Sequence, residues 1–167
     1  DKKTLDAIKT FDCKIIKQRG VGFGNALTQG INAVKTKYFC IFNADGSFNP
    51  IYLNDLLDKL VLNHDFVFCS RYEVGGGSED DTILTYIGNK FFTGLCNLLF
   101  RLNITDVLFT YVMGSTSAFK KLDMKYNDFS FCVELPIKAK KKNYVLGNLP
   151  SIERPRIAGV KKVNEFR

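Results

Sequence analysis

An apolar run that ends in two oxygen-bearing side chains is the part of this sequence best suited to chemistry. Residues 38–42 read Y-F-C-I-F, and Asn43 and Asp45 follow with one residue between them. The run predicts a buried strand, and Gly46 marks a turn after it. A carboxylate beyond the carboxyl end of a strand in an open α/β sheet is well placed to hold a divalent cation. The alternative is an ordinary turn in which Asp45 only accepts hydrogen bonds from backbone amides.

A glycine-rich segment, R-G-V-G-F-G-N at residues 19–25, precedes a predicted helix. Free backbone N–H groups at the start of a helix bind anions, so Arg19 and Gly22 are candidates for contact with a phosphate. The segment is neither a P-loop nor a complete G-x-G-x-x-G motif, because Asn25 occupies the position of the last glycine. A tight strand-to-helix turn without any ligand is the alternative.

A second basic candidate follows the strand predicted at 65–70. Arg71 comes at the end of that strand, before three consecutive glycines at 75–77, and we expect it on the same edge of the sheet as Asp45. The planar fork of an arginine suits a phosphate. The alternative is a surface salt bridge to one of the acids that follow, which are Glu79, Asp80 and Asp81.

Strands and helices alternate along the chain that carries these residues. The predicted strands are 14–18, 38–42, 65–70, 115–119 and 144–149, and the predicted helices are 25–36, 50–62, 80–102 and 131–142. This alternation is typical of βαβ units and predicts an α/β fold with a mainly parallel sheet. The length predicts a single domain, 1–167, that ends in a basic segment at 153–167.

The composition narrows the class of protein. The 167 residues carry a formal net charge of +7, which favours an anionic partner such as a phosphorylated substrate, a membrane surface or nucleic acid. The five cysteines are widely spaced, form no C-x-x-C pair and share the chain with one histidine, so a zinc site is not expected. A reduced, cytoplasmic setting fits this cysteine pattern best.

One predicted helix approaches the length of a membrane span. Residues 83–102 are largely apolar, but Asn89, Lys90, Asn97 and Arg101 interrupt them. A span needs about 20 predominantly apolar residues with few charges. The segment is therefore predicted to be a helix that is either buried or faces a membrane.

Taken in order, these motifs resemble one family. The series F-N-A-D-G-S at 42–47, C-S-R-Y-x-x-G-G-G at 69–77 and I-T-D-V-L at 104–108 is similar to the family 2 glycosyltransferases. Within that family it resembles the branch of dolichol-phosphate mannosyltransferase and related polyprenyl-phosphate sugar transferases. The resemblance extends from about residue 18 to residue 162.

The resemblance implies a GT-A fold, a Rossmann-like sheet whose D-x-D element holds Mg²⁺ or Mn²⁺ against the diphosphate of a nucleotide sugar. In this chain Asn43 and Asp45 match that element, and Ser47 matches a further polar residue beside the metal. Asp106 matches an acid near the acceptor pocket, and Glu134 matches a catalytic acid of relatives that act on hydroxyl groups. A basic segment that closes over phosphates is matched by Arg154, Arg156, Lys161 and Lys162.

The chain departs from the family pattern in three places. Asn43 is a neutral ligand where the family has an acid, and an arginine common after the Asp106-type acid is absent. The family also opens with two strands that help to bind the nucleotide base, and this chain begins after both. We therefore expect either a fragment or a degenerate member of the family.

The predicted function is inverting transfer of a sugar from a GDP- or UDP-sugar to a polyprenyl phosphate, in the cytoplasm or at the cytoplasmic face of a membrane. A lipid phosphate attacks unaided, whereas a saccharide hydroxyl needs a base such as Asp106 or Glu134. A saccharide acceptor and a non-catalytic scaffold remain open as alternatives. A basic nucleic-acid-binding module is a remote one, and no nucleic acid partner is expected because no RNA-binding motif is present.

Overall fold

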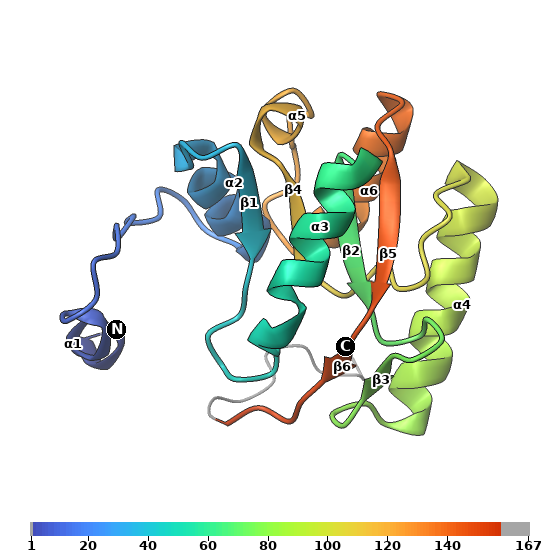
Figure 1. Cartoon of the computed structure of the whole chain (residues 1–167), viewed down its shortest axis with the longest axis horizontal. Coiled ribbons are helices and arrows are strands. Elements are labelled where there is room, and N and C mark those ends of the chain that lie inside the picture. Colours follow the sequence, from blue (N-terminus) through green and yellow to red (C-terminus); the bar gives the residue numbers. More distant parts are fainter. Residues whose placement is uncertain (1, 158–167) are drawn as a thin grey trace.

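The computed structural model describes residues 2–157 and shows a central sheet with helices on both faces (Figure 1). The helices are α1 (Lys2–Ile8), α2 (Phe23–Ala33), the short 3-10 helix η1 (Pro50–Tyr52), α3 (Leu53–Asn63), α4 (Ile83–Phe100), α5 (Thr116–Lys120) and α6 (Phe131–Lys141). The strands are β1 (Tyr38–Ile41), β2 (Phe66–Ser70), β3 (Gly77–Ser78), β4 (Val112–Ser115), β5 (Leu146–Pro150) and β6 (Ile152–Glu153).

The main sheet has the strand order β1-β4-β2-β5. Strand β4 is antiparallel to both of its neighbours, whereas β2 and β5 are parallel. Three strands therefore run in one direction and β4 opposes them, which confirms the predicted α/β class. The short strands β3 and β6 form a separate parallel pair at the carboxyl ends of β2 and β5 (Figure 1).

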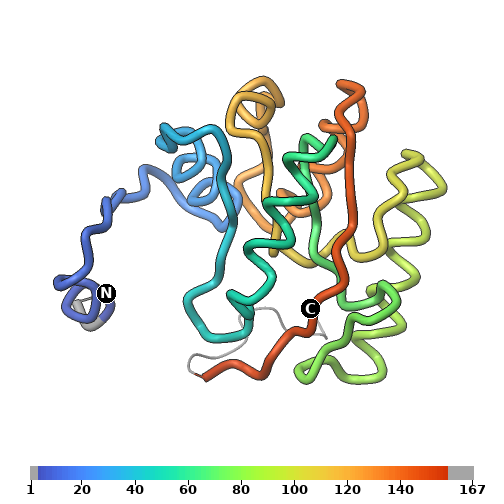
Figure 2. Tube along the Cα trace, viewed as in Figure 1, coloured from blue at the N-terminus to red at the C-terminus, as the bar shows by residue number. Residues whose placement is uncertain are grey.

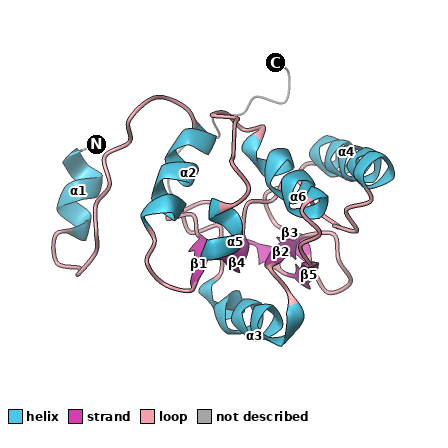
Figure 3. Ribbon diagram, turned by 90° about the horizontal axis from the view of Figure 1, so that it is seen from above, coloured by secondary structure: helices cyan, strands magenta, loops and turns pink. Residues whose placement is uncertain are grey.

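Two apolar layers hold the helices against the sheet. Seen along the sheet, α3 covers one face, and α2, α5 and α6 cover the other (Figure 3). Every residue of β2 is buried, and its side chains alternate between the layers as the period of a strand requires. Phe66 and Phe68 pack on the side of α2, α5 and α6, and Val67 and Cys69 pack on the side of α3. This double burial fixes β2, and with it the position of Arg71.

The strand predicted at 14–18 is wrong. These residues form no strand and lie in an extended connection from α1 to α2, beside the main body of the domain (Figure 2). Ile15 and Ile16 remain 58% and 42% exposed. A strand is stable only when a neighbour pairs with it, and residues 14–18 have no sheet neighbour within the part of the chain that the structure describes.

The strand predicted at 115–119 is also wrong, because a helix begins there. The side chain of Ser115 accepts a hydrogen bond from the backbone N–H of Ala118, which is the cap that starts α5. Strand β4 instead precedes this cap and ends at Ser115. The remaining predicted elements are found with ends shifted by a few residues.

None of the helices within residues 2–157 is long and apolar enough to cross a membrane.

The cysteines differ in burial, and we expect them to differ in reactivity for that reason. It raises the pKa of the Cys40, Cys69 and Cys132 thiols to about 12, whereas Cys13 is exposed. Because the thiolate is the reactive form, we expect iodoacetamide at pH 7.5 to label Cys13 in the native protein and to reach the other three only after unfolding. Peptide mapping by mass spectrometry, with and without urea, measures this. Native labelling of Cys69 at the rate of Cys13 would contradict the buried position of β2.

Candidate functional site

The loop after β1 fixes the carboxylate of Asp45. Its Oδ1 accepts hydrogen bonds from the backbone N–H of Ser47 at 3.1 Å and from the Ser47 hydroxyl at 2.6 Å. Gly46, between Asp45 and Ser47 in the chain, has a φ of 87°, a conformation that favours glycine. The other carboxylate oxygen, Oδ2, faces Arg156 at 3.8 Å. Partial burial raises the pKa of Asp45, but the Ser47 hydrogen bonds and the charge of Arg156 outweigh it, so this pKa lies below its ordinary value.

Residues 152–157, which we name the C-terminal strap, lie against this loop. The backbone N–H of Arg154 donates to the carbonyl of Ser47 at 3.0 Å, and that of Ile157 donates to the carbonyl of Asp45 at 2.9 Å. A Cβ atom on Gly46 would lie 2.5 Å from Cδ1 of Ile157. Glycine at position 46 therefore allows both the turn and the close approach of the strap.

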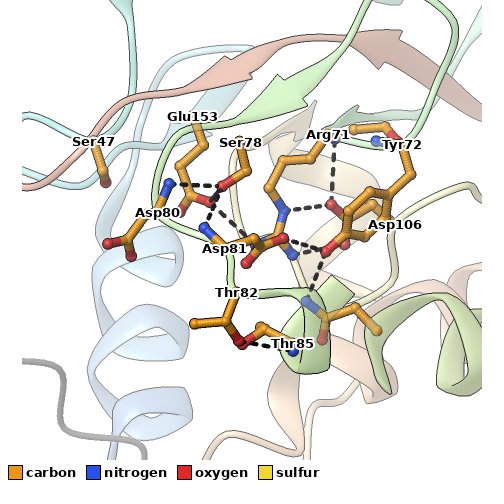
Figure 4. Close-up of polar contacts among 12 residues, drawn as sticks. Ser47, Arg71, Tyr72, Ser78, Asp80, Asp81, Thr82, Thr85, Asp106 and Glu153 are labelled. Carbon is orange, nitrogen blue, oxygen red and sulfur yellow. Dashed lines mark hydrogen bonds and ion pairs between the residues drawn. The ribbon is translucent and has the colours of Figure 1, made fainter. Parts of the chain in front are cut away.

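Arg71 forms the second part of the site, at the end of β2 (Figure 4). Its Nε and one terminal nitrogen bind the two oxygens of Asp106 at 2.7 and 3.1 Å. Its other terminal nitrogen donates to Asp81 at 3.2 Å and to Glu153 at 3.1 Å. The guanidinium is also 4.8 Å from the centre of the Phe109 ring. One cation therefore joins three acids that come from three separate segments of the chain.

These ion pairs are buried, and burial shifts the pKa values of the residues that form them. The side chain of Arg71 is 8% exposed and that of Asp106 is fully buried. Although burial opposes its charge, the hydrogen bonds and charge of Asp106 raise the pKa of Arg71, so it stays protonated. Burial, together with the nearby charge of Asp81, raises the pKa of Asp106 against the opposing effect of Arg71.

A cavity of about 440 Å³ opens beside Arg71, between residues 72–78 and the start of α4. Tyr72 and Tyr86 contact each other edge to face on its wall. The Tyr72 hydroxyl donates to Asp81 at 2.6 Å. The cavity is lined by Arg71, Tyr72, Glu73, Gly76, Gly77, Ser78, Asp81, Thr82, Ile83 and Tyr86. Charged, aromatic and aliphatic groups are thus available to one ligand.

The glycine-rich segment at 19–25 is held by other parts of the chain. A Cβ atom on Gly22 would lie 2.1 Å from the backbone oxygen of Asn127, and the backbone N–H of Asn25 donates to that same oxygen. The backbone of Arg19 exchanges hydrogen bonds with the Gln29 side chain. These contacts are with α2 and residues 126–128, and not with the loops that carry Asp45 and Arg71.

Glu134, at the start of α6, forms hydrogen bonds and an ion pair with neighbouring residues of the chain. Its two oxygens accept hydrogen bonds from the backbone N–H groups of Lys125 and Tyr126 at 2.7 and 2.9 Å, and it pairs with Lys138 at 2.7 Å. The side chain is 3% exposed. It therefore holds the loop before α6 in place.

Replacing Glu134 with glutamine is expected to lower the free energy of unfolding by about 1–3 kcal/mol, because the new amide would turn N–H groups toward backbone donors. Urea denaturation measures this, with exposed Glu79→Gln as the control. Unchanged stability would contradict the contacts described above. A fall in kcat of about 10²-fold in the folded variant would instead support the predicted catalytic role.

The structure thus brings together most of the predicted site residues and adds others. The strap residues Arg154 and Arg156 contact Ser47 and Asp45, and Arg71 binds both Asp106 and Glu153, the latter from the strap. The sequence interpretation missed Glu153 as a partner of Arg71, although it named Asp81 as one; the pair with Asp81 is buried rather than on the surface. Lys161 and Lys162 lie outside the described residues.

The arrangement defines an α/β domain of the GT-A type with acids and arginines gathered at the carboxyl ends of its strands. The family profile described as glycosyl transferase family 2 matches residues 1–123. The chain belongs to this family and is a glycosyltransferase. The matched residues include Asp45, Arg71 and Asp106, whereas Glu134 and the strap follow them.

Proposed function

We propose that this domain transfers a sugar, with inversion, from a GDP- or UDP-sugar to a polyprenyl phosphate. Membership of the family supports glycosyl transfer, and the proposal adds the donor, the acceptor and a metal. The observation that carries the choice of acceptor is that both candidate bases are already occupied. Asp106 is fully buried against Arg71, and Glu134 is bonded to backbone N–H groups.

An acceptor that is already an anion removes the need for a base. A phosphate oxygen attacks the sugar without losing a proton, whereas a saccharide hydroxyl must be deprotonated. Neither Asp106 nor Glu134 has an exposed carboxylate oxygen for that task. Because the carboxylates of both acids already bind other groups, a lipid phosphate is favoured over a saccharide as the acceptor.

The loop at Asp45 has the chemistry of a divalent-cation site. Within residues 2–157 no group of three acidic, cysteine or histidine side chains is arranged to hold an ion, but Mg²⁺ is usually held by one or two carboxylates and the phosphates of a substrate. Asp45, assisted by Asn43 and Ser47, would hold Mg²⁺ or Mn²⁺. Bound there, the ion supplies charge that stabilises the leaving diphosphate. Arg154 and Arg156 lie over the same loop and would share that role, joined by Lys161; Arg19 and Gly22 stay predicted phosphate contacts.

The surface of α4 supports a lipid acceptor. Ile83 and Tyr86 line the cavity beside Arg71 and belong to a helix whose large apolar side chains are mostly exposed. These side chains are Ile83, Leu84, Tyr86, Ile87, Phe91, Phe92, Leu95, Leu98, Leu99 and Phe100. A cavity that opens onto an apolar helix suits a phosphate carried on a hydrocarbon chain, and implies a peripheral contact with a membrane at its cytoplasmic face.

Calorimetric titration of the full gene product with GDP-mannose, UDP-glucose and their free nucleotides tests the donor site. We expect one of the two bases to bind in the presence of Mn²⁺ and to lose binding when a chelator is added. Release of the nucleoside diphosphate on addition of a short polyprenyl phosphate, compared with a soluble saccharide, tests the acceptor. Turnover with the saccharide alone would overturn the proposed acceptor, and donor binding without turnover would favour a scaffold.

A further inference from the structure

Arg156 contacts a second acid besides Asp45. Its Nε lies 3.8 Å from Oδ2 of Asp45 and 3.9 Å from Oδ2 of Asp80, so one nitrogen faces two carboxylates. Asp45 follows β1, whereas Asp80 lies between β3 and α4, 35 positions later in the chain. Figure 4 shows Asp80 on the side of the site where Ser47 lies.

The strap explains why these two loops meet. It is tied to the Asp45 loop by the backbone hydrogen bonds of Arg154 and Ile157. On its other side β6 pairs with β3, and the backbone N–H of Glu79 donates to the carbonyl of Glu153 at 3.0 Å. Both acidic loops are therefore fixed to the same short segment, and their approach is a property of the fold.

The contacts of Arg156 differ from those of Arg71 in strength. Arg71 binds Asp106 through two hydrogen bonds in a buried setting, whereas Arg156 approaches its acids at distances longer than a hydrogen bond. The side chains of Arg156, Asp45 and Asp80 are 32%, 26% and 25% exposed. Partly exposed ion pairs of this kind contribute little to stability. Arg156 is thus a cation that another cation can replace.

The Asp45 loop on its own offers a divalent cation little negative charge. Oδ1 of Asp45 is bonded to Ser47, which leaves Oδ2, and the neighbouring Asn43 is neutral. A hard divalent cation is held through one or two carboxylates before the phosphates of the substrate complete its shell. Asp80 is the acid that shares the counter-ion of Asp45.

We propose that Asp80 supplies the second carboxylate of the divalent-cation site at Asp45, directly or through a water molecule, and that the cation displaces Arg156 from between the two acids. The inference rests on the proposed function, because it takes the metal site at Asp45 as given. Asp80 would then supply the negative charge that the family has at the position of the neutral Asn43. The displaced guanidinium then lies next to the ion, where it can bind the diphosphate of the donor.

The affinity for Mn²⁺ alone, measured from the electron paramagnetic resonance of the free ion, tests the role of Asp80. Asp80→Asn is expected to weaken Mn²⁺ binding by about 10–100-fold, as loss of a metal-supporting group typically does. Glu79→Gln removes the same charge one residue away and is expected to change the affinity by less than about twofold. Asp80→Glu, which keeps the charge, is expected to recover part of the loss. Thermal melting confirms that each variant is folded.

The same measurement tests Arg156 in the opposite direction. Arg156→Gln is expected to tighten Mn²⁺ binding several-fold, because the ion no longer competes with a guanidinium. Arg101→Gln removes an equal charge from the exposed end of α4 and serves as the control. A gain that appears equally in both variants would overturn the role of Arg156.

The outcomes separate this inference from the proposed function. If Asp45→Asn abolishes Mn²⁺ binding while Asp80→Asn behaves like Glu79→Gln, the inference is wrong and the metal site at Asp45 stands. If the wild-type protein binds no Mn²⁺, with or without a nucleotide, both are overturned. Weakening by Asp80→Asn together with tightening by Arg156→Gln supports the inference.

Discussion

Replacing Arg71 with methionine is expected to lower the free energy of unfolding by about 3–5 kcal/mol, the range for breaking a buried ion pair by removing one partner. Methionine has a similar length and no charge, so Asp106, Asp81 and Glu153 would lose their shared cation within the buried end of the sheet. Methionine keeps the apolar stem of the side chain, so the loss reports the guanidinium group, including its contact with the Phe109 ring. The midpoint of urea denaturation measures the effect.

Two further variants identify the cause of this loss. Arg101→Met removes an exposed arginine at the end of α4, and we expect a change within about 0.5 kcal/mol. The double variant Arg71→Met with Asp106→Leu removes both partners of the shortest pair, and we expect it to recover part of the stability. An Arg71→Met protein as stable as the wild type would show that the three acids are neutralised in another way.

Asp45→Asn is expected to reduce kcat by about 10²–10³-fold, the usual effect of losing one electrostatic contact to a developing charge, because the proposed role of Asp45 is to hold the metal ion that makes this contact. The amide keeps the size of the side chain, so the hydrogen bonds to Ser47 stay largely available while the negative charge is lost. Release of nucleoside diphosphate under saturating Mn²⁺ measures the effect.

An exposed acid on α3 is the matched control. Asp58→Asn removes the same charge from the surface and is expected to leave kcat within about twofold, because screened surface charges act weakly at a distance. An Asp45→Asn enzyme with nearly normal kcat at all Mn²⁺ concentrations would refute the role of this carboxylate. A normal kcat reached only at high Mn²⁺ would indicate that Asp45 acts through metal affinity.

Local patterns in the sequence predict the parts of the fold that local interactions determine. The buried strand β2 and the turn at Asp45 are of this kind, because an apolar run followed by Asp and Gly has few other conformations. The segment 14–18 contains the apolar pair Ile15 and Ile16, but a strand also needs a partner, and no local pattern supplies one. Ser115 was read as part of a strand although its hydroxyl caps a helix.

The site depends on contacts that a local pattern does not encode. Arg71 was predicted to meet a phosphate or a nearby acid, and its partners include Glu153, which is 82 positions away. Glu153 is the first residue of the basic segment at 153–167, but no pattern in that segment indicates that it pairs with Arg71. The pairing of β2 with β5, followed by that of β3 with β6, brings it to Arg71. The salt bridge between Glu134 and Lys138, in contrast, follows from their i,i+4 spacing in a helix.

The position of the strap late in the chain has a consequence for synthesis of the protein. The sheet neighbours β1, β4 and β2 all precede residue 116, but the contacts that close the site come from residues 152–157. Arg71 and two of its acidic partners, Asp81 and Asp106, are therefore synthesised well before the third partner, Glu153. Asp45 and Asp80 likewise emerge long before the arginine that lies between them. The site therefore cannot close until residues 152–157 have been made, directly after β5, the last strand of the main sheet.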